Sequence, residues 1–385
     1  MLALPMLKAQ EVKPENQAQF ITKFRFYQLI GGIIIIRGTF NDIPDTLNFI
    51  LDTGSGAISI DSATAAEFKI PNFPSQMTVN GIAGIKKVNH SLHNTLHLPG
   101  LTVDSLNFFV NDYSLLSSVY GLKIDGVIGY SFLKRYIVAI NYDSLQISVY
   151  SNGTFNYAKG TTMLRPVFTA LPILPMPAKD RRSVFTNFYL DTGAGLCFLL
   201  SKKFIEDSTF LKKKRKPVGI LVQGPGGKRQ MQVTVIKKIK VGPFVFRKVP
   251  TNILDDEFNA LSYPFIGGLV GNDILRRFNV VLNYKARVIA IKPNSHFQDS
   301  YDYSYTGMNL YMEGDRIVID DIVKGSPADK AELKEGDIIL AVNNNMTNDI
   351  SSYKNSMQNV GAVIPIIISR NGEIFAKRIR IGRIY

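Results

Sequence analysis

The chain of 385 residues contains one cysteine, Cys197, and lacks any uninterrupted apolar stretch as long as a membrane-spanning helix. A single cysteine excludes an internal disulfide and a cysteine-rich metal site, and it leaves the redox compartment open. The apolar run "LIGGIIII" (29–36) has only the length of a β-strand. Low-complexity tracts are also absent. With 45% hydrophobic and 20% charged residues, the sequence is that of a folded protein of two or three domains.

Positive charge exceeds negative charge, and the net charge is +14. We interpret the densest basic run, "LKKKRKP" (211–217), as a solvated loop, and "IKKIK" (236–240) as a strand whose lysines face water. No aromatic residues are interleaved with these charges as they are in surfaces that bind nucleic acid, so no nucleic-acid partner is expected. Attraction to acidic substrates and peripheral association with an anionic envelope surface both stay open.

The N-terminal sequence "MLALPMLKAQEVKPE" (1–15) has a short apolar run that ends in Lys8-Ala9-Gln10. This is the form of a secretory signal remnant cleaved after Ala9, although a basic start and a full apolar core are missing. We therefore treat residues 1–23 as an N-terminal segment. A periplasmic or secreted bacterial protein is expected, and a cytoplasmic location stays open.

One nine-residue pattern occurs twice. The residues "NFILDTGSG" (48–56) return almost unchanged as "NFYLDTGAG" (187–195), with an offset of 139 between Asp52 and Asp191. Each copy is an apolar, strand-forming run that ends in an Asp-Thr-Gly turn. Because a carboxylate at the end of a buried strand is costly unless it has a task, the two copies suggest that the two acids meet.

The repeat extends well beyond these turns. "DGVIGYSFLKRYIVAINYDSLQISVY" (125–150) matches "GGLVGNDILRRFNVVLNYKARVIAIK" (267–292), and order and spacing are both kept. We infer an internal duplication that gives two homologous lobes, 24–150 and, with the linker between the lobes included, 151–296.

Within each lobe the pattern is that of β-structure, with short runs rich in Val, Ile, Phe and Thr separated by Gly, Pro and Asn. The only convincing helical turns are expected at "YSFLKRY" (130–136) and "NDILRRF" (272–278). A glycine-marked hairpin follows each Asp-Thr-Gly turn, at "VNGIAGIKK" (79–87) and "LVQGPGGKR" (221–229).

Residues 297–385 have no counterpart upstream and are expected to form a separate domain. Two strands precede a short helix at "SPADKAEL" (326–333), and another strand leads to a helix over 348–361 that starts with polar capping residues and ends at glycine. Two last strands are joined by the turn at Asn371-Gly372.

The two lobes resemble the retropepsin-like aspartic proteases, which combine an apolar strand leading into D-T-G-[SAT], a glycine-rich flap hairpin and a later apolar-apolar-Gly step before a short helix. The resemblance implies a mainly β chain of two homologous β-barrel lobes, with one active site between the lobes of a monomer and no cofactor or metal. Catalysis would belong to Asp52 and Asp191. The residues that would support this pair are Thr53, Gly54, Ser55, Thr192, Gly193 and Ala194. The flap glycines would be Gly81, Gly84, Gly224, Gly226 and Gly227.

Two departures from related enzymes are visible. Retroviral enzymes pair two identical chains, whereas these fused lobes look like the arrangement of pepsin. The lobes are nevertheless nearer to retropepsin in size, and neither flap shows the tyrosine at the tip of the pepsin flap.

The C-terminal residues resemble a PDZ domain of the bacterial type, an α+β fold, through "GSPADKAELKEGDIILAVNN" (325–344). The resemblance implies that this domain recruits a polypeptide substrate or a partner by its C-terminus. The loop that holds the terminal carboxylate would consist of Gly307, Met308, Asn309 and Leu310, although it departs from the usual G-x-G-F pattern.

The chemistry expected from this resemblance is hydrolysis of peptide bonds by water that a pair of aspartates activates. Two carboxyl groups in close contact cannot both ionise, so they share a proton and supply one base and one acid. Because Ser55 follows the first turn and Ala194 the second, we expect the serine hydroxyl to donate to Asp52, which would make Asp52 the ionised partner. The alternative is a catalytically inactive scaffold in which both kinds of domain only bind peptides.

Three other features have structural interpretations. His90, His93 and His97 are expected on a strand whose spacing puts neighbours on opposite faces, so no metal site is predicted. Cys197 lies in an apolar strand and is interpreted as a small core residue. The glycines in "GPGGKR" (224–229) lack the Gly-Lys-Ser/Thr ending and the helix of a phosphate-binding loop.

Overall fold

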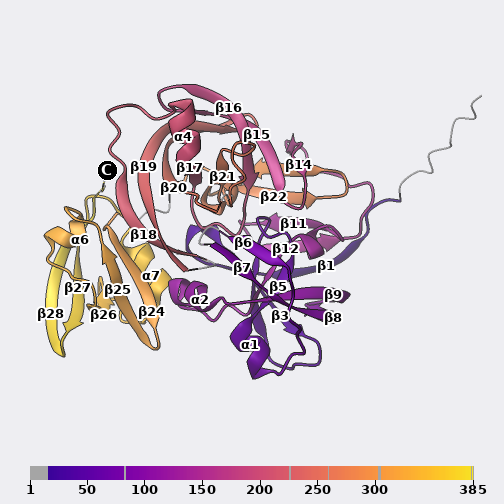
Figure 1. Cartoon of the computed structure of the whole chain (residues 1–385), viewed down its shortest axis with the longest axis horizontal. Helices are drawn as coiled ribbons and strands as arrows, with labels where there is room; N and C mark the ends of the chain where they lie inside the picture. Colours follow the sequence, from indigo (N-terminus) through magenta and orange to yellow (C-terminus); the bar gives the residue numbers. More distant parts are fainter. Residues whose placement is uncertain are drawn as a thin grey trace, which may run out of the picture.

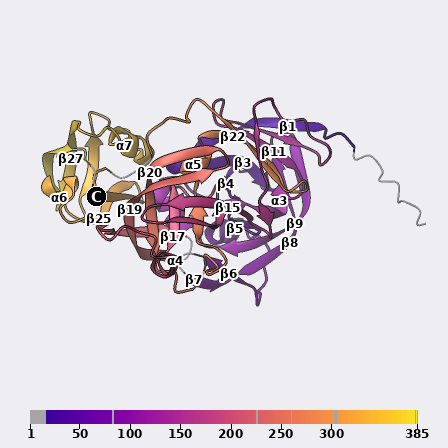
Figure 2. The same ribbon diagram turned by 90° about the horizontal axis from the view of Figure 1, so that it is seen from above.

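The computed structural model describes residues 16–81, 84–224, 227–258, 260–301, 305–382 and 384. Strands predominate and form two large sheets, a third sheet between them, a two-stranded hairpin and a separate five-stranded sheet near the C-terminus. Figure 1 shows the first half of the chain below, the second half above, and the C-terminal domain in yellow beside both. In Figure 2 this domain lies at one end of the molecule and β1 at the other. The prediction of a mainly β chain with two similar lobes and an α+β domain is confirmed.

The first lobe is built on a seven-stranded sheet of order β2-β3-β4-β10-β5-β9-β8, with the hairpin β6–β7 beside it. Strand β10 lies between β4, to which it is parallel, and β5, to which it is antiparallel. The strands of this lobe are β2 (Tyr27–Gln28), β3 (Ile34–Phe40), β4 (Leu47–Leu51), β5 (Ile58–Asp61), β6 (Thr78–Gly81), β7 (Gly84–Lys87), β8 (Asn89–Leu98), β9 (Leu101–Asn111) and β10 (Gly126–Ile128).

The second lobe repeats this plan in an eight-stranded sheet of order β14-β15-β16-β21-β17-β20-β19-β18. Its strand β21 is parallel to β16 and antiparallel to β17, as β10 is to β4 and β5. The strands are β14 (Val167–Phe168), β15 (Pro172–Lys179), β16 (Ser183–Leu190), β17 (Phe198–Ser201), β18 (Val218–Gly224), β19 (Gly227–Val241), β20 (Phe244–Leu254) and β21 (Gly268–Val270).

Between the lobes lies a six-stranded sheet of order β1-β12-β11-β22-β23-β13, in which β11 of the first lobe pairs antiparallel with β22 of the second. One buried apolar core extends through both lobes and this sheet, so the lobes are held firmly against each other. The boundary expected after residue 23 falls inside β1. The strands of this sheet are β1 (Phe20–Arg25), β11 (Ile137–Asn141), β12 (Gln146–Tyr150), β13 (Thr162–Leu164), β22 (Phe278–Asn283) and β23 (Val288–Pro293).

The C-terminal domain has its own apolar core and an antiparallel sheet of order β24-β25-β26-β27-β28. Strand β24 is an edge strand of this sheet, and it faces α2 of the first lobe and β18 of the second (Figure 1). The strands are β24 (Met308–Glu313), β25 (Arg316–Ile322), β26 (Ile338–Val342), β27 (Val363–Arg370) and β28 (Glu373–Arg380).

The helices are short. The two helical turns expected after the apolar-Gly steps are present as α3 and α5, and the C-terminal domain has the two expected helices, of which α7 ends five residues before Gly361. The expectation that the lobes contain no other helix is wrong. The helices are η1 (Ile30–Gly32), α1 (Ser62–Glu67), α2 (Ser114–Tyr120), α3 (Tyr130–Leu133), α4 (Lys202–Ser208), α5 (Asn272–Leu275), α6 (Pro327–Lys330) and α7 (Ile350–Ser356).

The physical reason for two of these additional helices is capping. The carboxylate of Asp61 accepts from the N–H groups of Ala63 and Thr64 at the start of α1, and the Ser201 hydroxyl accepts from an N–H at the start of α4. Such caps satisfy N–H groups that have no partner within the helix. Within the described ranges, no helix is both long and apolar enough to cross a membrane.

Candidate active site

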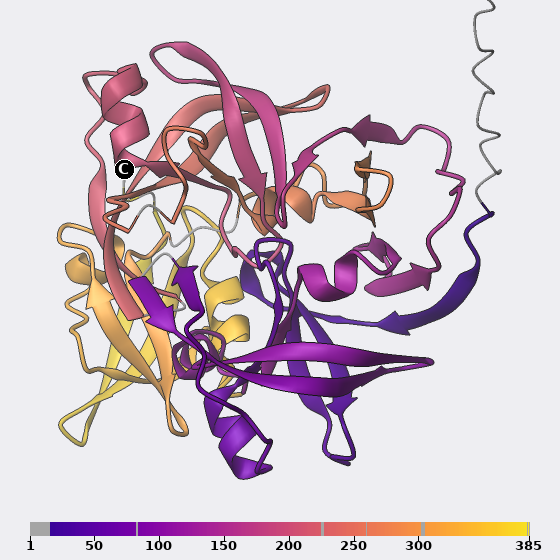
Figure 3. The same ribbon diagram turned by 45° about the vertical axis from the view of Figure 1, so that its right-hand side comes forward.

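The two Asp-Thr-Gly turns lie next to each other, although they are far apart in the sequence. Each follows a buried strand, β4 or β16, and a neighbouring parallel strand fixes its start. The Asp52 N–H donates to the carbonyl of Ile128 at 2.9 Å, and the Asp191 N–H donates to that of Val270 at 3.0 Å. Figure 3 shows the first lobe below and the second above, with these strand ends converging between them.

Thr53 and Thr192 bind the two turns to each other. The N–H of each threonine donates to the hydroxyl oxygen of the other at 3.0 Å. Each hydroxyl then donates to the carbonyl of the residue before the other lobe's aspartate, at 2.8 Å for Thr53 and 2.9 Å for Thr192. Both threonines are only 1% exposed, so these four bonds are shielded from competition with water.

Gly54 and Gly193 allow the carboxyl groups to approach. A Cβ on Gly54 would overlap the carboxyl group of Asp191, and a Cβ on Gly193 would overlap that of Asp52. The Gly54 N–H donates to Asp52 at 2.6 Å, and the Gly193 N–H donates to Asp191 at 2.8 Å. Each carboxyl group is therefore bonded by its own turn and packed against the turn of the other lobe.

Burial raises the pKa of both carboxyl groups, and the pKa of Asp52 is raised well above its ordinary value because the charge of Asp191 adds to the effect of burial. The two side chains share a hydrogen bond. The N–H groups of Gly193 and Ala194 favour the charged form of Asp191, and those of Gly54 and Gly193 favour the charged form of Asp52. The two carboxyl groups therefore titrate as a pair that shares one proton.

The hydrogen bond on which the expected ionisation of Asp52 was based has a different acceptor in the structure. The Ser55 hydroxyl donates to the backbone carbonyl of Ala57 at 3.1 Å, not to its own aspartate. At the second turn, the backbone N–H of Ala194 donates to Asp191 at 3.1 Å. The additional donor therefore belongs to the second turn and comes from the main chain, where the choice between serine and alanine has no influence.

The glycine-marked hairpins are both present, but they differ. Gly81 and Gly84 pair with each other in the small separate hairpin β6–β7. Gly224 and Gly227 pair at the end of β18–β19, which belongs to the large sheet of the second lobe. Gly226 lies outside the described residues. Only the first hairpin is thus separate from the sheet of its lobe.

The four residues of the expected carboxylate loop lie at the start of β24, against the lobes. Gly307 has a φ of +73°, and Met308 and Leu310 are buried. The Asn309 amide donates to the carbonyl of Leu221 in β18 at 2.5 Å. The domain is therefore bound directly to the hairpin of the second lobe.

The C-terminal domain also contacts the first lobe. The Ser118 hydroxyl in α2 donates to the carbonyl of Met312 in β24 at 2.5 Å, and the Lys354 ammonium in α7 donates to that of Val119 at 3.3 Å. Between β24 and α7 lies a cavity of about 220 Å³, lined by residues that include Met308, Leu310, Met357, Tyr120 and Gly195. This cavity joins the C-terminal domain to the region of the second turn.

Two tyrosines near the pair were not found from the sequence. Burial raises the pKa of Tyr113 to about 12, and its hydroxyl lies 2.6 Å from that of Ser59. Burial and the charges of Asp191 and Asp52 raise the pKa of Tyr120. Both tyrosines come from the segment around α2, a helix that was not predicted. Nothing in the sequence of this segment indicated that it lies beside the two aspartates.

The three other features are placed as follows. His90, His93 and His97 all lie on β8. Among the residues that the structure describes, no group of three His, Cys, Asp or Glu side chains is arranged to hold a metal. Cys197 is buried, with its sulfur 2.8 Å from a carboxylate oxygen of Asp273.

Comparison with known proteins assigns the same three parts. The family model described as aspartyl protease matches residues 36–132 and 182–274, one segment in each lobe, and that of the PDZ domain matches 318–370. A putative zinc metalloprotease of Thermotoga maritima is 44% identical over 55 residues, 14% of this chain and 11% of that protein. A probable periplasmic serine endoprotease, DegP-like, of Chlamydia pneumoniae is 39% identical over 59 residues, 15% of this chain and 12% of that protein. The chain thus covers only a small part of either relative.

Proposed function

This chain belongs to the retropepsin-like aspartyl proteases, with two protease lobes in tandem and a C-terminal PDZ domain, and on that premise we propose that it is an aspartic endopeptidase. The observation that carries the proposal is the buried Asp52–Asp191 pair, whose two turns are bound to each other by Thr53 and Thr192 and whose carboxyl groups both have pKa values raised by burial. Both aspartates come from one chain, so a monomer would contain the complete site.

In the proposed reaction, Asp191 is the base and Asp52 is the acid. The charged carboxylate of Asp191 takes a proton from a water molecule, whose oxygen attacks the carbonyl carbon of the peptide bond. The carboxyl group of Asp52 donates its proton to the carbonyl oxygen. Asp191 then returns a proton to the leaving nitrogen as the bond to carbon breaks, and Asp52 recovers its own.

The surrounding residues position the pair. The reciprocal bonds of Thr53 and Thr192 fix the distance between the turns, and Gly54 and Gly193 permit the contact between carboxyl groups. The hairpins β6–β7 and β18–β19 are proposed to cover the bound chain. No cofactor takes part in this scheme.

Cleavage of an unfolded protein tests the proposal. Asp52→Asn and Asp191→Asn should each abolish cleavage, because neither carboxyl group performs both proton transfers, while Asp45→Asn, at an exposed position, should cleave like the wild type. Pepstatin should inhibit the wild type. Near-wild-type turnover in either of the first two variants would refute the mechanism, and pepstatin binding without any cleavage would identify a scaffold instead.

The PDZ domain is proposed to bind the C-terminal end of a polypeptide, with an apolar side chain in the cavity between β24 and α7. Met357→Trp would fill this cavity, whereas Val360→Trp changes an exposed position of the same domain. We expect the first change alone to slow cleavage of long chains with an apolar C-terminus and to spare short internal peptides. Equal effects of both changes on long chains would refute recruitment. The periplasmic relative supports a periplasmic or secreted location as part of this proposal.

A further inference from the structure

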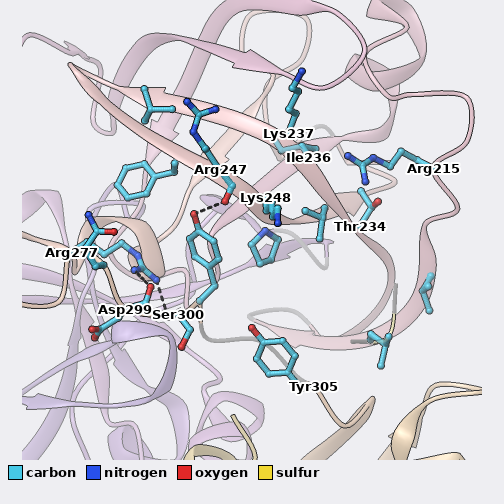
Figure 4. Close-up of a pocket in the computed structure, with 18 of the residues that line it drawn as sticks. Arg215, Thr234, Ile236, Lys237, Arg247, Lys248, Arg277, Asp299, Ser300 and Tyr305 are labelled. Atoms are coloured by element: carbon cyan, nitrogen blue, oxygen red, sulfur yellow. Dashed lines mark hydrogen bonds between the residues drawn. The ribbon is translucent and has the colours of Figure 1, made fainter. Parts of the chain in front are cut away.

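A second cavity lies on the second lobe, with a volume of about 1130 Å³. Its walls come from the middle of β19, from β20, from the loop before β18 and from the segment that leads to the PDZ domain. Figure 4 shows Arg277 at one end, Arg215 at the other and Lys248 between them. We call this cavity the basic groove.

The basic groove contains positive charge that the described residues do not neutralise. Arg215 is paired with Asp180, and Arg277 donates to Asp273 and to backbone carbonyls. Within the described part of the chain, five other cations of the lining have no hydrogen-bond or ion-pair partner. These are Lys214, Lys216, Lys237, Arg247 and Lys248.

Neighbouring strands increase this concentration of charge. Lys238 pairs with Arg247 across β19 and β20, and with Lys179 across β15. Like charges directly opposite each other are destabilising. Asp299, the only acid among the described residues of the lining, is itself within reach of Arg276 and His296. An anionic ligand would therefore relieve repulsion that the described part of the chain leaves uncompensated.

Apolar side chains also line the basic groove, among them Val218, Val245 and Phe297, and Val245 is 41% exposed. Phe246 and Phe297 pack on each other and on Phe278, and the guanidinium of Arg277 lies 4.7 Å from the ring centre of Tyr301. Three of the four aromatic rings in the described lining are thus engaged within the protein, whereas single-stranded nucleic acid stacks successive bases on such rings.

The shape also favours a chain over a surface. Lys248 lies between Arg277 and Arg215 in this hollow, which apolar side chains also line. The volume is at the upper end of ligand cavities and exceeds what one small anion would fill. We propose that the basic groove binds a polypeptide segment in which acidic residues are interspersed with apolar ones.

The position connects this binding to the proposed cleavage. Strand β19 begins in the glycine-marked hairpin at Gly227 and passes the basic groove at residues 234–237. A segment held there lies at the base of the hairpin that is proposed to cover the substrate. The binding segment would belong to the substrate itself, and only this last step rests on the proposed endopeptidase function.

Binding is tested with the full-length Asp52→Asn protein, which leaves the probe intact. The probe is a labelled peptide that mixes glutamate and leucine, and its control has glutamine in place of each glutamate. The test variant is Lys237→Gln/Arg247→Gln/Lys248→Gln. The matched control is Lys23→Gln/Arg25→Gln/Lys159→Gln, which removes two lysines and one arginine from exposed positions on β1 and the loop after β12.

We expect fluorescence anisotropy to show at least about tenfold weaker binding for the test variant and little change for the control variant, since three charge contacts are lost. Equal weakening in both variants would overturn the proposal, as would equally tight binding of the glutamine peptide. Stronger binding of single-stranded DNA or of anionic vesicles, with the same loss in the test variant, would also overturn it. If the test variant does not fold, Lys216→Glu, on the exposed loop, replaces it. Absence of cleavage by the wild type, with intact binding by the Asp52→Asn protein, would refute the proposed endopeptidase function and leave the basic groove as a binding site.

Discussion

The Thr53 hydroxyl offers the sharpest test of how the two lobes are coupled. Thr53→Val keeps the shape of the side chain but removes the oxygen that donates to the carbonyl of Leu190 and accepts from the N–H of Thr192. Two buried polar groups of the second lobe then have no partner. Since each such group costs about 1–3 kcal/mol, the free energy of unfolding should fall by about 2–6 kcal/mol.

A matched control separates this loss from the removal of any buried threonine hydroxyl. The Thr22 hydroxyl makes one bond, to the carbonyl of Pro99 at 2.7 Å, and Thr22 is 8% exposed. Thr22→Val leaves one group unpaired, so its loss should be about half as large. Thr53→Ser keeps the hydroxyl and should restore most of the stability.

Urea unfolding followed by circular dichroism measures these differences. The rate of peptide cleavage supplies a second readout, because a small displacement of the two turns should reduce kcat by about 100-fold in Thr53→Val. A stability loss for Thr53→Val no larger than that for Thr22→Val, together with a near-wild-type kcat, would refute the idea that the threonine bonds hold the pair in place.

Three further predictions concern charge. Folding raises the pKa of Asp52. The contribution of this carboxyl group to the stability of the fold is therefore complete below the ordinary carboxyl pKa of about 4 and is lost as pH rises through the raised value. Asp52→Asn should unfold at a higher temperature than the wild type at neutral pH, and a lower unfolding temperature there would contradict this reasoning. Ser55 donates to the carbonyl two residues further on, so by symmetry the new hydroxyl of Ala194→Ser should donate to the carbonyl of Leu196. The pH profile of cleavage should then stay unchanged. A shift of the profile toward acid would instead show that the hydroxyl donates to Asp191, as first expected. Desolvation lowers the pKa of Lys354 to about 8, so the free energy of unfolding should rise with pH between about 8 and 10.5. Lys354→Met should be more stable than the wild type at neutral pH and should not show this rise. If the variant still shows the rise, Lys354 is not its source.

Local repeats in the sequence predicted the parts of the site that each lobe builds alone. The strands before Asp52 and Asp191 and the helical turns α3 and α5 follow from apolar runs and glycine steps of matching spacing. Two missed helices had a usable pattern, since Asp61 and Ser201 are standard capping residues placed 140 positions apart in the two lobes. The residues around these two caps have the pattern of a strand that continues, so the helices α1 and α4 were not recognised.

Contacts between distant parts could not be predicted in this way. The bond from Ser118 to Met312 and that from Asn309 to Leu221 join segments separated by 194 and 88 residues. Neither pair has a pattern of its own, because what brings its members together is the packing of a whole domain on both lobes. For the same reason, the sequence predicted a PDZ domain on a short link but not its contact with the hairpin of the second lobe.

The difference between the two turns shows why residue types alone were a poor guide to the hydrogen bonds that the aspartates accept. The turns differ in sequence at Ser55 and Ala194, which suggested that the serine hydroxyl would favour the charged form of Asp52. In the structure that hydroxyl satisfies a backbone carbonyl, while Asp191 accepts two N–H groups of its own turn. Any residue at position 194 except proline has a backbone N–H that can donate to Asp191. Whether this bond forms depends on the orientation of the turn and not on the side chain. The symmetry of the threonine bonds holds the carboxyl groups together, and the hydrogen bonds that each carboxyl group accepts from its own turn are set by the main chain.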